Sequence, residues 1–285
     1  MRVFPFSRLL LAGLAASCLV PAPAAASSPE LIGLERELSM LITGRSGNYG
    51  IAALDLRDGS IVAVNGDAPF PMASTVKLTI AAAYLAEVDG GRRSLDDMIG
   101  SRPVKKILEL MLVHSDNQAA DQLLSTLGGP AAVQQWLWSQ KITGIRIDRT
   151  IAQLLREHGH LADSRDIATP NAMIALLNRL SNGTVLTAQS RDFLFDLMSR
   201  CATGTRRIRA LLPAGTPVED KTGTLNGVTN DVGFIIMPDG HRVAVAVFAR
   251  GGRDRQSGIA EVARMIYDRF ADSTRNALAL FLQIR

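Results

Sequence analysis

Hydrophobic and polar residues alternate near both ends of the chain, a pattern typical of half-buried β-strands. Near the amino-terminal end, residues 49–56 and 60–65 alternate around Asp58-Gly59, a dipeptide common in tight hairpin turns. Near the carboxyl-terminal end, the pattern returns in residues 231–237 and 241–250. These segments predict an antiparallel sheet assembled from both ends of the chain.

The apolar positions between these two regions follow the helical period instead. One apolar face is formed by Val104, Ile107, Leu108, Met111 and Leu112. Thr169 followed by Pro170 is typical of the first residues of a helix, and Thr187 indicates the start of another. Helices are also expected beside the strands, at residues 29–41 and 258–270.

This order of elements predicts an α/β fold with an antiparallel sheet flanked by terminal helices, plus an all-helical part. The expected α/β domain is discontinuous and combines residues 27–66 with residues 201–285. Residues 67–200 form the expected helical domain. The active site is expected between the two domains.

The first 26 residues predict a secretory signal peptide. A basic start is followed by the apolar run 9–20 and by the small residues Ala24-Ala25-Ala26, which are typical of a cleavage site. The apolar run is too short to cross a bilayer as a helix. We therefore expect an exported protein, periplasmic or secreted, that is cleaved after Ala26. Cys18 offers a weaker alternative, a lipoprotein anchor.

Composition narrows the class of protein further. Cys201 is the one cysteine outside the expected leader, so we expect no intramolecular disulfide. The chain has 31 basic and 27 acidic residues, and the leader contains two of the basic and none of the acidic ones. This nearly even balance argues against a nucleic acid or a membrane surface as a partner. We expect a monomer without a transmembrane segment, a metal or a cofactor.

Three short motifs carry candidate chemistry. Ser74 and Lys77 stand three residues apart at the start of an apolar helical run, where a desolvated lysine can act as a base toward the serine. Ser115 and Asn117 lie between two expected helices, and Lys221-Thr222-Gly223-Thr224 lies on an expected strand. Each motif alone has a plain structural alternative: a helix cap, a lysine extended into solvent, or a strand that ends in a turn.

Together and in this order, the motifs Ser-x-x-Lys, Ser-Asp-Asn and Lys-Thr-Gly match the signature of class A β-lactamases and penicillin-binding proteins. Surrounding segments such as "FPMASTVK", "RDIATPNAM" and "DKTGTLNGVTND" also look like family segments. The chain thus resembles the class A β-lactamase family from about Leu34 to Ile266. The resemblance implies a serine hydrolase that works through an acyl-enzyme.

The resemblance also implies roles for the motif residues. Ser74 would be the nucleophile, and Lys77 would assist its deprotonation. Ser115 would pass a proton to the leaving nitrogen, with electrostatic help from Lys221.

The remaining implied roles concern substrate binding. The backbone amides of Ser74 and Thr224 would form the oxyanion hole, and Asn117 would contact the acyl side-chain amide of the substrate. Thr222, Gly223 and Arg207 would bind the substrate at its carboxylate. Arg209 and Asp220 resemble a structural ion pair beneath the site.

The chain departs from the family in the omega loop, whose ends match Arg149 and Asp166. Where the family has the glutamate and the asparagine that hold the hydrolytic water, this chain has Ile151 and Leu155. Neither side chain can accept a proton, so deacylation is expected to be slow. Glu157, the nearest carboxylate downstream, is an alternative base.

Two further features bear on function. His158 and His160 could be proposed as a base or metal ligands, but we interpret them as solvated loop residues. Between residues 94–97 and Ser115 the chain is shorter than the usual family member, which predicts a more open cleft.

Three functions are compatible with these features. A β-lactam hydrolase with slow turnover is favoured by the whole-chain likeness. A D-Ala-D-Ala carboxypeptidase, or a related amide hydrolase acting on peptides, is favoured by the missing glutamate and the open cleft. A non-turnover β-lactam binder is the third. The expected substrate is therefore a β-lactam or a D-Ala-D-Ala-like peptide.

Overall fold

The computed structural model describes residues 29–157 and 163–283, with side-chain environments up to Asp272. The expected signal peptide, Cys18, His158 and His160 lie outside these described residues. No helix among the described residues is long and apolar enough to span a membrane.

Within the described residues, a five-stranded antiparallel sheet has the strand order β2-β1-β9-β8-β7. Its strands are β1 (Asn48–Asp55), β2 (Ile61–Val64), β7 (Val218–Leu225), β8 (Val228–Ile236) and β9 (Arg242–Arg250). The expected hairpins are confirmed, because β1 pairs with β2 and β8 pairs with β9. The two ends of the chain meet where β1 pairs with β9 along its whole length.

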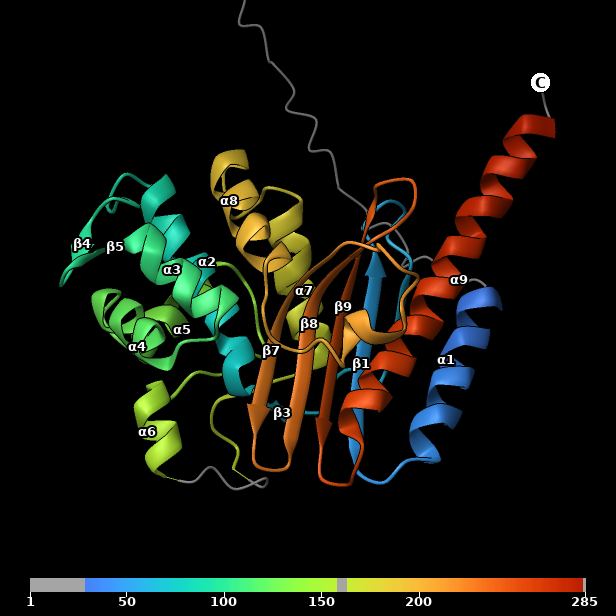
Figure 1. Cartoon of the computed structure of the whole chain (residues 1–285), viewed down its shortest axis with the longest axis horizontal. Coiled ribbons are helices and arrows are strands. Elements are labelled where there is room, and N and C mark those ends of the chain that lie inside the picture. The colour runs from blue at the N-terminus through green and yellow to red at the C-terminus, as the bar shows by residue number, and fades with distance from the viewer. Residues whose placement is uncertain (1–28, 158–162, 284–285) are drawn as a thin grey trace, which may run out of the picture.

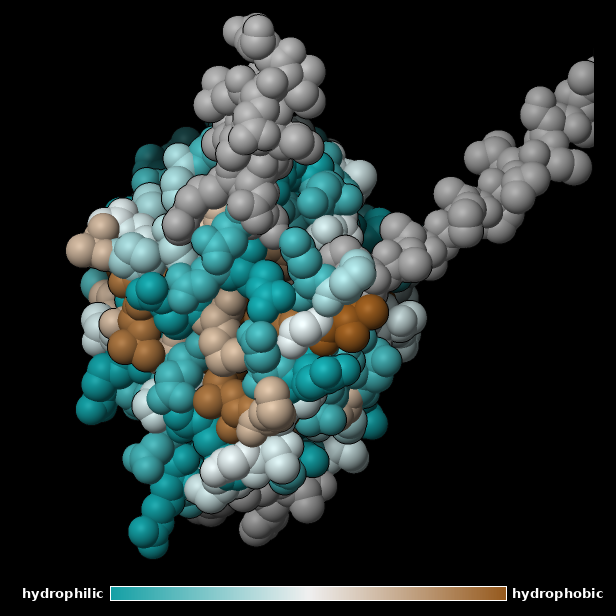
Figure 2. All heavy atoms as spheres, turned by 90° about the vertical axis from the view of Figure 1, so that its right-hand side faces the viewer, coloured by the Kyte–Doolittle hydropathy of each residue, from teal (hydrophilic) through white to brown (hydrophobic). Residues whose placement is uncertain are grey.

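The helices α1 (Pro29–Thr43) and α9 (Arg255–Gln283) cover one face of this sheet (Figure 1). Leu34 and Leu38 of α1 and Ile259 and Ile266 of α9 share one core cluster with inward residues of the strands. The outer face of this helical layer is largely hydrophilic, with small separate groups of hydrophobic residues (Figure 2).

The other face of the sheet packs against the helical part. Its helices are α2 (Val76–Asp89), α3 (Val104–Val113), α4 (Asn117–Thr126), α5 (Pro130–Ser139), α6 (Ile151–Arg156), α7 (Pro170–Ser181) and α8 (Ala188–Ser199). It also contains four two-residue strands, β3 (Phe70–Pro71), β4 (Met98–Ile99), β5 (Arg102–Pro103) and β6 (Ile167–Ala168), where the pattern had predicted helix and loop alone.

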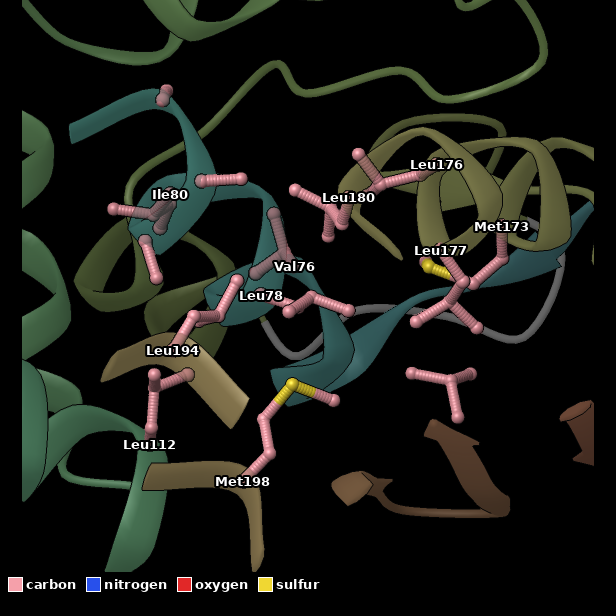
Figure 3. Close-up of a cluster of buried hydrophobic side chains, with 14 of the residues drawn as sticks. Val76, Leu78, Ile80, Leu112, Met173, Leu176, Leu177, Leu180, Leu194 and Met198 are labelled. Atoms are coloured by element: carbon pink, nitrogen blue, oxygen red, sulfur yellow. The ribbon is translucent and has the colours of Figure 1, made fainter. Parts of the chain in front are cut away.

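Helix α2 is buried on every side over its first ten residues. Labelled side chains of α2, α3, α7 and α8 converge in one hydrophobic cluster (Figure 3). Such a helix has no polar face toward water, so any charge on it must lie in the protein interior. Lys77 lies on this helix.

The predicted fold class is confirmed, whereas the predicted domain boundaries remain a prediction. Pro71, although proline is common in the first turn of a helix, does not open α2 but pairs with Ile167 as the end of β3. A 3₁₀ turn, Ala73–Thr75, separates β3 from α2. Pairing between β3 and β6 involves residues almost a hundred positions apart, so local sequence could not reveal it.

Candidate active site

Ser74 lies in the 3₁₀ turn that joins β3 to α2. The preceding residue, Ala73, has a φ of +51°, a left-handed conformation that costs a non-glycine residue about 1–3 kcal/mol. Asn230 of β8 holds this turn by donating from Nδ2 to the carbonyl oxygens of Pro71 (2.8 Å) and Met72 (3.0 Å). The nucleophile candidate is therefore fixed to the sheet by buried hydrogen bonds.

The strand β7 passes close to the same turn at Gly223. A Cβ atom at this position would lie 2.6 Å from the carbonyl oxygen of Met72 and 3.3 Å from the Cβ of Ala73. The close neighbour of Gly223 is therefore the chain's own backbone. Glycine lets β7 place Thr224 beside the turn that carries Ser74.

Lys77 is fully buried, and its Nζ contacts the Ser-Asp-Asn segment rather than Ser74. It donates to the carbonyl oxygen of Ser115 (2.6 Å), to Asn117 Oδ1 (2.6 Å) and more weakly to Ser115 Oγ (3.3 Å). Within the described part of the chain, no hydrogen bond joins Lys77 Nζ to Ser74 Oγ. Burial and the charge of Lys221 together lower the pKa of Lys77 to about 7.

Lys221 of β7 approaches Ser115 from the other side. Its Nζ donates to Ser115 Oγ (3.0 Å) and to the carbonyl oxygen of Thr222 (2.9 Å). Burial lowers the pKa of Lys221 to about 8. Ser115 has a φ of +57°, so this residue also occupies the left-handed region. The Ser115 hydroxyl is thus held between the Nζ atoms of the two lysines, where it can relay a proton.

Arg207 lies under the edge strand and is buried. Its guanidinium donates to the carbonyl oxygens of Gly223 (3.1 Å) and Asn230 (2.8 Å) and to Thr224 Oγ1 (2.6 Å). Burial lowers the pKa of Arg207. Arg207 Nη1 thus supports the backbone of β7 and β8. Nη2 reaches the Thr224 hydroxyl, at the end of the site where the substrate carboxylate is expected to bind.

Two residues near Thr222 were not predicted from sequence. Thr203 Oγ1 lies 2.6 Å from Thr222 Oγ1, and the buried thiol of Cys201 lies 3.3 Å from Thr203 Oγ1. Burial raises the pKa of the Cys201 thiol, which keeps it neutral. No motif marks Thr203, because a threonine before a glycine is common in loops.

Two buried carboxylates, Asp220 of β7 and Asp231 of β8, lie on neighbouring strands. Arg209 forms an ion pair with Asp220, as the sequence indicated. Asp231, two residues along β8 from the partner of Asp220, was not predicted. Burial raises the pKa of Asp220 and, further, that of Asp231.

The two ends of the expected omega loop are joined by ion pairs. Arg149 Nε lies 2.5 Å from Asp166 Oδ2, and Arg149 Nη1 lies 3.0 Å from Glu157 Oε2 and 2.9 Å from Asp163 Oδ2. Glu157 also pairs with Arg165 at 3.0 Å. The hydrogen bond from Arg149 holds the pKa of Glu157 below its usual range. The Glu157 carboxylate is therefore engaged in the ion pairs that join the two ends of the loop.

The two substituted loop positions lie on the short helix α6. Ile151 is 6% exposed and belongs to the helical core, whereas Leu155 is 46% exposed. Asp121 of α4 accepts hydrogen bonds from the backbone amides of Ile151 (2.7 Å) and Ala152 (2.9 Å). A carboxylate thus contacts the backbone of α6 although position 151 itself carries a hydrocarbon. Asp121 was not predicted from sequence.

The structure brings the three motifs together through Ser115, which both lysines contact, and through Gly223, which contacts the turn before Ser74. Within the described residues, no group of three or more His, Cys, Asp or Glu side chains is arranged to hold a metal ion. The expected absence of a metal or cofactor remains a prediction.

Comparison with known proteins gives a consistent result. Residues 33–270 match the model of the Beta-lactamase enzyme family. The chain is 29% identical over 268 residues to the extended-spectrum beta-lactamase PER-1 of Pseudomonas aeruginosa, covering 82% of this chain and 86% of the relative. It is 30% identical over 276 residues to the carbapenem-hydrolyzing beta-lactamase KPC of Klebsiella oxytoca, covering 87% and 93%.

Solved structures agree. The class A beta-lactamase described as the last common ancestor of Gram-negative bacteria (GNCA4) superposes with a TM-score of 0.79 at 37% identity, covering 84% of this chain and 99% of the other. A beta-lactamase from Chitinophaga pinensis superposes with a TM-score of 0.78 at 27% identity, covering 83% and 98%. The chain therefore belongs to the β-lactamase enzyme family and is a serine hydrolase of class A.

Proposed function

We propose that this protein opens β-lactams by acylation of Ser74 and that it hydrolyses the acyl-enzyme slowly. The observation that carries the proposal is the convergence of Lys77 and Lys221 on Ser115, together with the close packing of β7 against the turn that carries Ser74. This arrangement can move protons for an acyl transfer. The hydrocarbon side chain at position 151 leaves hydrolysis of the product without its usual base.

In the first half of the reaction, Ser74 Oγ attacks the carbonyl carbon of the β-lactam and gives up its proton. Lys77 accepts this proton when neutral, and its pKa of about 7 makes the neutral form abundant at neutral pH. Its Nζ must turn from Ser115 toward Ser74, three residues away on the same helical face. Catalytic hydrogen bonds commonly tighten in this way once substrate is bound.

The carbon–nitrogen bond then breaks, and the leaving nitrogen takes a proton from Ser115 Oγ. The two ammonium groups beside Ser115 can resupply that proton. The backbone amides of Ser74 and Thr224 stabilise the oxyanion, at roughly 3–4 kcal/mol per donor. Thr222, Thr224 and Arg207 receive the substrate carboxylate, and Asn117 contacts the amide of the acyl side chain.

A second candidate is hydrolysis of a D-Ala-D-Ala-like peptide. This candidate is supported by the absence of a carboxylate at position 151. Acylation by a peptide would use the same residues as acylation by a β-lactam. The relatives named as β-lactamases favour the first candidate. A β-lactam binder without turnover would differ only in the lifetime of its adduct.

Time-resolved mass spectrometry separates these possibilities. With a penicillin, we expect a burst of one equivalent and an adduct on Ser74 that decays slowly, and Ser74→Ala should give none. Fast hydrolysis with no detectable adduct would contradict slow deacylation. Release of D-alanine from a peptide, at a rate exceeding β-lactam turnover, would favour the second candidate.

A further inference from the structure

The side chain of Thr222 contacts the loop 201–207, which follows α8, through both of its branches. Thr203 Oγ1 lies 2.6 Å from Thr222 Oγ1. The backbone of the loop is so close to the methyl group that a Cβ atom at Gly204 would lie 2.4 Å from Thr222 Cγ2. Contacts to both the hydroxyl and the methyl group restrict the rotation of the Thr222 side chain.

The loop is itself fixed to the segment that carries Ser115. The backbone amide of Ala202 donates to the carbonyl oxygen of Val113 (2.9 Å), two residues before Ser115. Lys221 connects Thr222 to the same serine, because its Nζ donates to Ser115 Oγ (3.0 Å) and to the carbonyl oxygen of Thr222 (2.9 Å). The loop and the strand residue that it contacts are therefore both anchored to this part of the site.

The contact between the two threonine hydroxyls holds one proton, and its direction decides what Thr222 can bind. Each hydroxyl has one proton to donate. If Thr222 donates to Thr203, it keeps no proton for a ligand. If Thr203 donates, Thr222 can donate to a carboxylate, which has no proton of its own. Recognition of an anionic substrate by Thr222 thus requires Thr203 as the donor.

Cys201 lies at the other end of this hydrogen-bonded chain. Its Sγ is 3.3 Å from Thr203 Oγ1 and 3.7 Å from the Thr203 carbonyl oxygen. Burial raises the pKa of the thiol, so it keeps its proton and can donate to Thr203. Donation to Oγ1 leaves the Thr203 proton for Thr222. Hydrogen bonds that run in one direction, from the thiol to Thr203 to Thr222, strengthen one another.

We propose that Thr203 is a positioning residue that makes the site selective for β-lactams bearing a carboxylate, by donating to Thr222 Oγ1 and leaving the Thr222 proton for that carboxylate. This inference rests on the proposed function, in which Thr222 receives the substrate carboxylate. Thr203 acts through Thr222 and takes no part in the covalent steps at Ser74. Its loss should therefore weaken the selection of charged over neutral substrates.

The test compares benzylpenicillin with its methyl ester, a β-lactam that lacks the charged carboxylate. Second-order acylation rates are measured by mass spectrometry and expressed as a ratio, carboxylate over ester. Thr203→Val removes the hydroxyl and keeps the shape of the side chain. We expect it to lower the ratio at least about threefold, within the range that one hydrogen bond contributes, and Thr203→Ser should restore the ratio. Thr205→Val, the same change at an exposed position of the loop, is the control and should leave the ratio unchanged.

A double variant tests whether Thr203 acts through Thr222. Thr222→Val should lower the ratio by itself, and adding Thr203→Val should lower it no further. A ratio in Thr203→Val that stays within about threefold of the wild type overturns the inference, and this includes equal slowing with both compounds, as a purely structural role would cause. The same drop in Thr205→Val, a failed rescue by Thr203→Ser or a further drop in the double variant also overturns it.

The wild type tests the proposed function separately. If it forms no adduct with either compound, the proposed function fails. If it is acylated by both compounds at equal rates, acylation by β-lactams stands, and the inference about Thr203 is overturned alone.

Discussion

Gly223 of β7 lies so close to Met72 that a Cβ atom there would be 2.6 Å from the Met72 carbonyl oxygen. This contact sets the spacing between the strand that carries Thr224 and the turn that carries Ser74. Backbone atoms on both sides of the contact leave no flexible side chain that could yield.

Gly223→Ala should therefore push β7 away from the turn. We expect the free energy of unfolding to fall by about 1–3 kcal/mol, the usual cost of overpacking, and acylation to slow more than tenfold. Denaturant unfolding and stopped-flow acylation measure the two effects. Gly44→Ala is the control, because the nearest atom to its added Cβ would be 3.6 Å away. Normal acylation by Gly223→Ala would contradict the account.

Asn230 connects the nucleophile turn to β8, the strand next to the edge strand β7. Asn230→Ala leaves the carbonyls of Pro71 and Met72 without this donor, and a buried unsatisfied group costs about 1–3 kcal/mol. We expect lower stability and slower acylation together, measured by chemical denaturation and by the burst rate. Asn182→Ala, at the exposed end of α7, should leave both unchanged; equal losses in the two variants would argue against a specific role.

The acylation rate should depend on pH through the two buried lysines. Lys77 acts as a base only when neutral, so the rate should rise as pH increases through about 7. Lys221 must stay charged, so the rate should fall as pH increases beyond about 8. The second-order acylation rate with a penicillin should therefore trace a narrow bell. A rate that is constant across this range would contradict the assigned roles.

A carboxylate restored at position 151 should accelerate loss of the adduct. We expect Ile151→Glu to shorten the adduct lifetime at least about tenfold, at some cost in stability because Ile151 is buried in the core. Combining it with Leu155→Asn should shorten the lifetime further. Ala152→Glu places the same charge on an exposed neighbour and should have no such effect. An unmoved lifetime in Ile151→Glu would show that residue 151 does not face the acyl group.

The sheet and most helices could be predicted because their signals are local. Thr169 and Thr187 cap α7 and α8 as their positions suggested. The start of α2 could not be predicted, since Pro71 is equally suited to a helix start and to the edge strand that its distant partner Ile167 imposes.

The difference between local signals and contacts made by distant parts of the chain also applies to the site. The lysines and serines stood out because three motifs occurred in order. Asp121 and Asn230 did not, because their importance depends on which backbone packs against them. An aspartate inside a polar helix looks like any solvated residue until α6 is placed on it. The run Thr229-Asn230-Asp231 at the start of an otherwise apolar strand was a signal that could have marked Asn230.

The burial of Lys77 has a consequence for the whole chain. An ammonium whose pKa falls from 10.5 to about 7 makes the folded state less favourable by on the order of 4 kcal/mol at neutral pH, because the unfolded chain binds the proton more tightly. The penalty fades as pH rises from about 7 toward 10.5. Resting enzyme should thus gain thermal stability in mild alkali, and selection for reactivity opposes selection for folding at this residue.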